Sequence, residues 1–228
     1  MANRQGASST RSKSGRKAPT ARPARSSTPH QVRIIGGQWK RTPLAVLDEE
    51  GLRPTPDRVR ETVFNWINHF LGGVWEDATC LDLFAGTGAL GFEAASRGAA
   101  RVVMVESNMS AANQLQATKA KLKAEHVEIV RGDAVAVGAS LLQRSGGGSR
   151  FQVVFLDPPY HQHWIARTLP LCERLLAEEG LVYVEAETAL NEGTPPAWLA
   201  GWSIVRADKA GMVFYHLLQR KAAHHFEA

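Results

Sequence analysis

The sequence predicts an α/β fold built around a mostly parallel, doubly wound sheet. Short β-like segments alternate with helical segments along most of the chain, and this alternation is typical of a parallel sheet with helices on both faces. The chain has 228 residues, of which 44% are hydrophobic. It is therefore long enough for one α/β domain with a real core, plus a tail.

The N-terminal arm, residues 1–31, is predicted to be disordered and basic. It contains no Phe, Trp or Tyr and almost no large aliphatic residue, so it cannot bury enough apolar surface to offset the entropy of ordering. Through residue 47 the chain carries ten Lys or Arg and no acid, whereas the remainder carries 17 basic and 22 acidic residues. Three interpretations stay open: an arm that contacts nucleic-acid phosphates, a solubilising tail, and a cleaved organelle transit peptide.

The folded domain is expected to span residues 32–228, and its first part, 32–72, is expected to form a hairpin and a helix. Two short β-like runs surround Gly36-Gly37, which is a turn signal. Further along, Thr55 is placed to cap a helix and Pro56 to open it. Apolar residues then recur at helical spacing, which predicts a helix that packs one face on the domain.

The core, residues 79–220, contains five strand candidates separated by helical stretches. These candidates are residues 79–84, 101–106, 127–131, 151–156 and 181–185. Two further candidates, 202–206 and 213–218, follow with no helix of useful length between them. We therefore expect them to form an antiparallel hairpin at the edge of the sheet. The Gly-rich and Ser-rich segment 145–149 is expected to be a surface loop.

A glycine-rich turn follows the first core strand. Gly86, Gly88 and Gly91 are spaced as G-x-G-x-x-G, which permits a tight turn into a helix and the close approach of a ligand to the backbone. Glu106 lies 20 residues beyond Gly86, so the segment also matches the dinucleotide fingerprint. On this pattern alone, a nicotinamide-dependent dehydrogenase remains possible.

Four carboxylates favour a different ligand. Asp82, Glu106, Asp133 and Asp157 end or directly follow four successive strands, so they are expected to meet at one edge of the sheet. They would repel a pyrophosphate. They would instead accept hydrogen bonds from a ligand that carries an ammonium, a sulfonium, two ribose hydroxyls and an adenine amino group. The pattern therefore predicts S-adenosylmethionine as the cofactor.

Three of these carboxylates have an expected role at the cofactor. Glu106 should accept the two ribose hydroxyls, Asp133 the adenine amino group, and Asp82 should face the methionine end. The expected cofactor-binding residues are Asp82, Phe84, Gly86, Gly88, Gly91, Glu106, Asp133 and Ala134.

The fourth core strand leads into Asp157-Pro158-Pro159-Tyr160. Two consecutive prolines fix the backbone and remove two amide donors, so the turn is rigid and rich in acceptors. The Asp157 carboxylate and the Pro158 carbonyl can hold the two N–H bonds of an exocyclic amine, and Tyr160 can stack on its base. Asp157, Pro158 and Tyr160 are therefore the expected catalytic residues for amine methylation. Whether Asp157 also takes the proton stays open.

The remaining features point to a cytoplasmic protein without a metal site. The sequence has no apolar run of about 18 residues and no secretory h-region, so no membrane association is expected. Cys80 and Cys172 lie far apart and are expected to be buried thiols. Neither the loop pair His161 and His163 nor the terminal pair His224-His225 has the surroundings of a good metal site.

The motifs resemble those of a known family. Asp82-x-Phe84-x-Gly86-x-Gly88, followed by Asp157-Pro158-Pro159-Tyr160, resembles the class I amino-methyltransferases. Within that class, residues 33–37, 40–41 and 53–66 closely resemble the bacterial 16S ribosomal RNA guanine-N2 methyltransferases of the small subunit, family D. The resemblance covers residues 32–218 and leaves out the arm.

The resemblance implies a Rossmann-like class I methyltransferase fold with a seven-stranded sheet. It implies that the substrate is a guanine of 16S rRNA, either naked or in a 30S particle, and we expect the enzyme to act as a monomer. It also implies that a set of basic residues grips RNA: Arg33, Lys40, Arg41, Arg53, Arg58 and Arg60. Adenine-N6 methylation of DNA or RNA, methylation of a protein glutamine, and a non-catalytic RNA-binding role are the alternatives.

Overall fold

A computed structural model describes residues 32–46, 55–144, 150–160, 163–190 and 192–221. Several sequence-based predictions concern residues outside these ranges. They are the arm 1–31, Arg53, the loop 145–149, His161 and the pair His224-His225.

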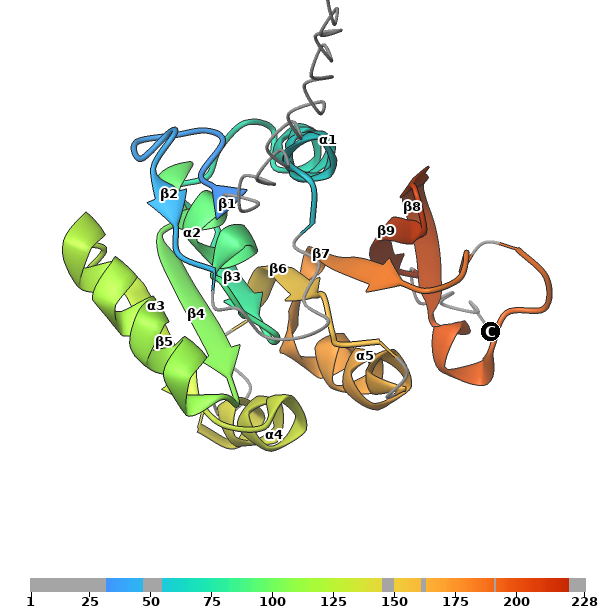
Figure 1. Cartoon of the computed structure of the whole chain (residues 1–228). Coiled ribbons are helices and arrows are strands. Elements are labelled where there is room, and N and C mark those ends of the chain that lie inside the picture. The colour runs from blue at the N-terminus through green and yellow to red at the C-terminus, as the bar shows by residue number, and fades with distance from the viewer. Residues whose placement is uncertain (1–31, 47–54, 145–149, 161–162, 191, 222–228) are drawn as a thin grey trace, which may run out of the picture.

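One seven-stranded sheet runs through the molecule in the order β5-β4-β3-β6-β7-β9-β8 (Figure 1). The strands are β3 (Thr79–Asp82), β4 (Arg101–Glu106), β5 (Val127–Arg131), β6 (Phe151–Leu156), β7 (Leu176–Ala186), β8 (Trp202–Ala210) and β9 (Val213–Arg220). The pairs among β3 to β7 are parallel, and β9 lies antiparallel between β7 and β8. The predicted α/β class and the edge hairpin are therefore confirmed.

Helices cover both faces of this sheet. They are α1 (Asp57–Phe70), α2 (Ala89–Ser96), α3 (Met109–Leu122), α4 (Ala134–Arg144), α5 (Trp164–Leu175) and the short 3₁₀ helix η1 (Ala197–Leu199). The apolar residues of α1, α2 and α3 pack in one core layer, and those of α4, α5 and η1 pack in the other. Figure 1 shows α1 on one side of the strands and α4 and α5 on the other. None of the helices in the described ranges combines the length and apolar character needed to cross a membrane.

Alternating strand residues supply the two core layers. In β3, Cys80 packs with the α1–α3 layer and Leu81 with the α4–α5 layer, and Val153 and Val154 divide in the same way in β6. Because successive side chains of a strand point to opposite faces, a strand buried on both faces is apolar throughout. This explains why the core strands appear as continuous apolar runs.

The N-terminal hairpin differs from the prediction in its second strand. β1 (Val32–Arg33) pairs with β2 (Pro43–Leu44), whereas the second run was expected directly after Gly36-Gly37. Residues 37–41 form turns instead, because Gly37 lies against the end of α2, where the backbone N–H of Gln38 donates to the Ser96 carbonyl at 2.7 Å. The predicted hairpin exists, but its turn is longer.

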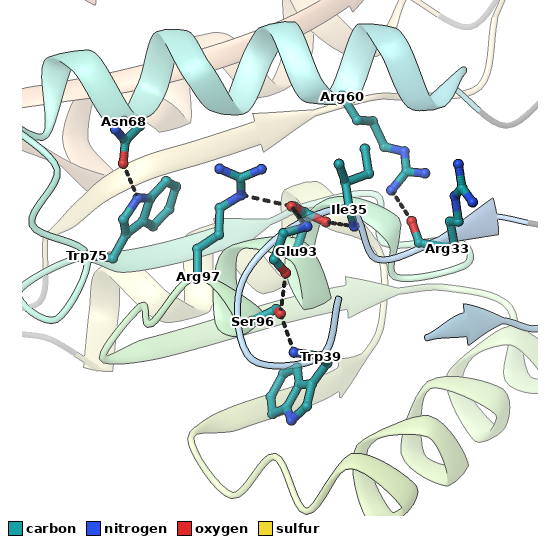
Figure 2. A network of polar contacts seen from close by, with 10 residues as sticks. Arg33, Ile35, Trp39, Arg60, Asn68, Trp75, Glu93, Ser96 and Arg97 are labelled. Carbon is teal, nitrogen blue, oxygen red and sulfur yellow. Dashed lines mark hydrogen bonds and ion pairs between the residues drawn. The ribbon is translucent and has the colours of Figure 1, made fainter. Parts of the chain in front are cut away.

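The loop of this hairpin is fixed on α2 by a buried carboxylate (Figure 2). Glu93, which is fully buried, accepts the backbone N–H of Ile35 at 2.6 Å and that of Gly36 at 2.8 Å, and it forms an ion pair with Arg97. Ser96 donates to the Gly36 carbonyl at 2.6 Å. The N-terminal segment is therefore held on the same helix that follows the glycine loop.

The helix after Pro56 forms, but Thr55 does not cap it. Pro56 occupies the N-cap position of α1 and makes no side-chain cap hydrogen bond. The Thr55 hydroxyl instead donates to Glu185 in β7. The helical periodicity is confirmed, because Val59, Val63 and other predicted positions of α1 are buried.

The order of the strands reverses at β3. The chain runs from β3 outward to β4 and β5, and then returns to β6 on the other side of β3. In open α/β sheets, ligands bind at the carboxyl ends of the strands where the order reverses in this way. The candidate site therefore lies between the ends of β3 and β6.

Candidate active site

Asp82, the last residue of β3, fixes the glycine loop between β3 and α2 through two backbone hydrogen bonds. This carboxylate is 1% exposed and accepts the backbone N–H of Phe84 at 3.3 Å and that of Gly91 at 3.2 Å. Burial raises the pKa of Asp82 to about 7, and the two backbone hydrogen bonds oppose that increase. Asp82 thus supports the loop and has almost no surface for the methionine end of a cofactor, contrary to the expectation.

Glycine is needed at positions 86, 88 and 91 for different structural reasons. Gly86, at φ +50°, has open space where a side chain would lie. At Gly88 a Cβ atom would lie 2.5 Å from Phe92, and at Gly91 it would lie 2.4 Å from the sulfur of Met104. Gly86 is therefore the position that leaves room for a ligand, whereas Gly88 and Gly91 permit the helix to pack closely.

Glu106, at the end of β4, connects the loop to the next strand. Its carboxylate accepts the backbone N–H of Gly86 at 2.8 Å and that of Asn108 at 2.8 Å. An ionised carboxylate has about four acceptor positions, so two remain for other donors. This residue can therefore fix the loop and still accept two hydroxyl groups.

Asp133 and Ala134 begin the next helix. One oxygen of Asp133 accepts the backbone N–H groups of Val135 and Ala136, both at 3.0 Å, so this side chain caps α4. Asp133 is exposed and follows the carboxyl end of β5 in the chain. The side chain of Ala134 is buried. The ring of Phe84 makes an edge-to-face contact with the ring of Trp164, and the two ring centroids are 5.5 Å apart.

The turn that follows β6 lies next to this loop. The backbone N–H of Leu83 donates to the carbonyl of Phe155 at 3.2 Å, so the ends of β3 and β6 are directly paired. Beyond them, Asp157 is half-buried, Pro158 is buried and Tyr160 is 42% exposed. The structure therefore brings the Asp-Pro-Pro-Tyr turn beside the glycine loop, as the sequence predicted.

Three further residues complete the site, and none of them was assigned to it from the sequence. Glu185, in β7 and 3% exposed, accepts the hydroxyl of Thr55 at 2.6 Å and that of Tyr183 at 2.7 Å. The Thr55 hydroxyl also lies 3.3 Å from the carboxylate of Asp157. One signal was available, because Glu185 stands near the end of a predicted strand, as the other carboxylates do.

The basic residues expected to grip RNA divide into two groups. Arg33, Lys40, Arg41 and Arg58 are exposed. Arg60 is fully buried, and its guanidinium donates to the Arg33 carbonyl at 2.8 Å and to Asp57 at 2.7 Å. A side chain without exposed surface cannot contact a phosphate, so the prediction for Arg60 is wrong.

No group of three or more His, Cys, Asp or Glu side chains in the described ranges could hold a metal ion. Both cysteines are buried, and burial raises the pKa of each thiol far above its ordinary value. They therefore serve as core residues, as predicted.

Comparisons with known proteins agree with this arrangement. A family described as "Conserved hypothetical protein 95" matches residues 32–219. The ribosomal RNA small subunit methyltransferase D of Escherichia coli strain K12 is 45% identical over 194 residues, which cover 84% of this chain and 91% of that protein. The protein of the same name from Haemophilus influenzae is 39% identical over 83% of this chain and 94% of its own length. The chain belongs to the ribosomal RNA small subunit methyltransferase D family.

A similar solved structure carries the description of a putative methyltransferase. The Escherichia coli protein yhhF is 42% identical, with a TM-score of 0.69, and the match covers 84% of this chain and 98% of that one. Family D membership confirms the resemblance and removes the dehydrogenase interpretation of the glycine loop. The matched range includes the glycine loop, Asp157 and Glu185, whereas the basic arm lies before it.

Proposed function

We propose that this family D member transfers the methyl group of S-adenosylmethionine to the exocyclic N2 of a guanine in 16S rRNA. The observation that carries the proposal is the direct pairing of the β3 and β6 ends, which brings the Asp157-Pro158 turn beside the open position at Gly86. A methyl donor bound at the glycine loop and an amine held at the turn would then be neighbours.

The residues around the loop fit the donor. Gly86 has open space above it, and Glu106 keeps acceptor positions for the ribose hydroxyls. The second oxygen of Asp133 is available for the adenine amino group. When bound, S-adenosylmethionine supplies an activated methyl group on a sulfonium. Gly86, Glu106 and Asp133 would fix its position.

The residues of the turn fit an exocyclic amine. The lone pair of such an amine is delocalised into the base, so both N–H bonds must be held for the nitrogen to attack. Asp157 and the Pro158 carbonyl provide two acceptors, and the exposed ring of Tyr160 provides a surface on which a base can stack.

The relatives support the choice of ribosomal RNA, whereas the choice of guanine rests on the resemblance of the sequence motifs. Both curated relatives are named as small-subunit ribosomal RNA methyltransferases. The exposed Arg33, Lys40, Arg41 and Arg58 lie on the N-terminal segment and on α1, where they can contact phosphates.

A labelling experiment tests this proposal. The purified protein is incubated with radiolabelled S-adenosylmethionine and 16S rRNA from cells that lack the protein, either naked or in 30S particles. We expect label in the RNA and its recovery as N2-methylguanosine after digestion. Label in adenine, or only in DNA, would contradict the substrate assignment.

A further inference from the structure

The strongest feature that goes beyond the proposed function is the contact of the half-buried carboxyl group of Asp157 with the surroundings of a buried one, that of Glu185. β6 and β7 are parallel, with Leu156 opposite Val184, so Asp157 and Glu185 are the next residues on two adjacent strands. One hydroxyl, that of Thr55, lies 2.6 Å from Glu185 and 3.3 Å from Asp157. We call these two acids the Asp157–Glu185 pair.

The number of hydrogens in this cluster indicates where a proton must lie. The hydroxyl of Tyr183 donates its only hydrogen to Oε1 of Glu185 at 2.7 Å, and Thr55 donates its only hydrogen to the same oxygen. Oδ2 of Asp157 therefore faces the hydroxyl oxygen of Thr55, whose hydrogen is already donated to Glu185. A proton on Asp157 satisfies this contact, and two ionised carboxylates do not.

The charged groups around the pair favour one shared proton. Burial, the neighbouring Glu185 and then Asp82 of β3 raise the pKa of Asp157 well above its ordinary value. Burial also raises the pKa of Glu185, but the hydroxyls of Thr55 and Tyr183 and the buried Arg60 of α1 stabilise its ionised form. On β9, Tyr215 faces Tyr183. Asp157 therefore holds the proton, and Glu185 holds the charge.

We propose that the Asp157–Glu185 pair is a proton relay that removes the proton released by the target amine. The lone pair of the amine nitrogen forms the bond to the methyl carbon, and the electrons of the carbon–sulfur bond remain on sulfur. The nitrogen then passes one proton to the free oxygen of Asp157. Asp157 passes its own proton to the Thr55 oxygen, while the hydroxyl proton of Thr55 passes to Glu185. The pair ends with two protons and no charge, and it returns one proton to water through the half-buried Asp157.

This inference rests on the proposed function, and it gives the two acids different roles. Asp157 touches the amine and is the catalytic residue. Glu185 acts through Asp157 and is a positioning residue that also accepts the relayed proton. If position 185 needed only a polar side chain, glutamine would serve there equally well.

The first test needs no substrate. The full-length protein is labelled with ¹³C at the Asp carboxyl carbons, and Asp157 is titrated by NMR. We expect Asp157 to titrate in two steps in the native protein, one of them well above the usual range. In Glu185→Gln it should titrate in a single step nearer its ordinary pKa, because the neighbouring charge is gone. An identical titration in both proteins would overturn the inference.

The second test measures methyl transfer. Glu185→Gln keeps the shape of the side chain, and we expect it to lower kcat by about 10²-fold while leaving cofactor affinity unchanged. Thr55→Val, which removes the shared hydroxyl and so interrupts the relay, should cause a loss of similar size. Glu179→Gln, an exposed position on the same strand, is the matched control and should retain full activity. Equal kcat values for Glu185→Gln and the native protein would contradict the relay.

The two tests separate the relay from the proposed function. If no RNA is methylated by the native protein, the proposed function fails, and the titration still decides whether the pair shares a proton. If RNA is methylated, and both the titration of Asp157 and the kcat for methyl transfer are unchanged in Glu185→Gln, only the relay fails.

Discussion

Arg58 and Arg60 lie two positions apart on α1, and their surroundings give them opposite roles. Arg58 is exposed, whereas Arg60 is fully buried between Asp57 and the backbone carbonyl of Arg33. Asp57 is 38% exposed and also pairs with Arg33, so the costly consequence of removing Arg60 is the loss of a buried donor to the Arg33 carbonyl. An exposed arginine contributes little to stability but keeps its charge available for a phosphate.

The same substitution at both positions tests this difference. We expect Arg60→Met to lower the free energy of unfolding by about 3 kcal/mol, because the Arg33 carbonyl loses its donor and an ion pair is lost. Arg58→Met should change stability by no more than about 0.5 kcal/mol. Urea denaturation of both variants measures the effect on stability.

RNA binding provides the complementary readout. Arg58→Met should weaken binding and reduce the slope of log K against log salt by roughly 0.7 to 0.9, as expected for one lost phosphate contact. Equal stability losses for the two variants would show that the burial of Arg60 has no energetic importance.

At the scale of elements, the N-terminal hairpin is attached to α2 by backbone contacts that require glycine. Gly37 has φ +72°, and a Cβ atom there would lie only 1.8 Å from the Ser96 carbonyl oxygen. That same carbonyl accepts the backbone N–H of Gln38 at 2.7 Å. Any side chain at this position must therefore move the hairpin away from the end of α2.

Two glycine substitutions test the attachment. Gly37→Ala combines the strain of a positive φ with the clash against Ser96. Gly72→Ala is the matched control, because Gly72 has a similar φ of +62° but no atom within 4 Å of the added Cβ. We expect Gly72→Ala to cost about 1 kcal/mol from strain alone and Gly37→Ala to cost about 2 kcal/mol more.

Chemical denaturation of the two variants measures this difference. If they lose the same free energy of unfolding, the hairpin is not held by the contact at Ser96. In that case the buried Glu93, with its two backbone donors, would be the main attachment.

At the scale of the whole molecule, the charge is divided between the arm and the body. Residues 1–31 contain seven Lys or Arg and no acid, whereas the chain beyond residue 47 has more acids than bases. The candidate site lies within residues 32–219, which the family model matches, whereas the arm lies outside this range. We therefore expect the arm to add affinity without choosing the base.

A full-length variant with the seven basic residues of the arm replaced by Gln tests this expectation. Because each phosphate contact releases counterions, the slope of log K against log salt should become shallower by up to about 6. The site of methylation on 16S rRNA should remain the same. An unchanged slope, measured by RNA binding at several salt concentrations, would favour a solubilising tail.

The sequence alone determined the sheet, its C-terminal hairpin and the Asp157-Pro158-Pro159-Tyr160 turn. Their signals are local, because apolar runs, glycine spacing and Asp157-Pro158 can be recognised within a few residues. It also predicted that carboxylates would gather at the strand ends, since parallel strands place those ends at one edge.

Only the tertiary structure decided which of these groups are buried and which are paired. Thr55 was expected to cap a helix, but it contacts Glu185, 130 residues away in the chain. Asp82 and Arg60 were expected at the ligand surfaces, but both are buried. The physical reason is that burial and long-range hydrogen bonding depend on which elements pack together, and no local pattern contains that information.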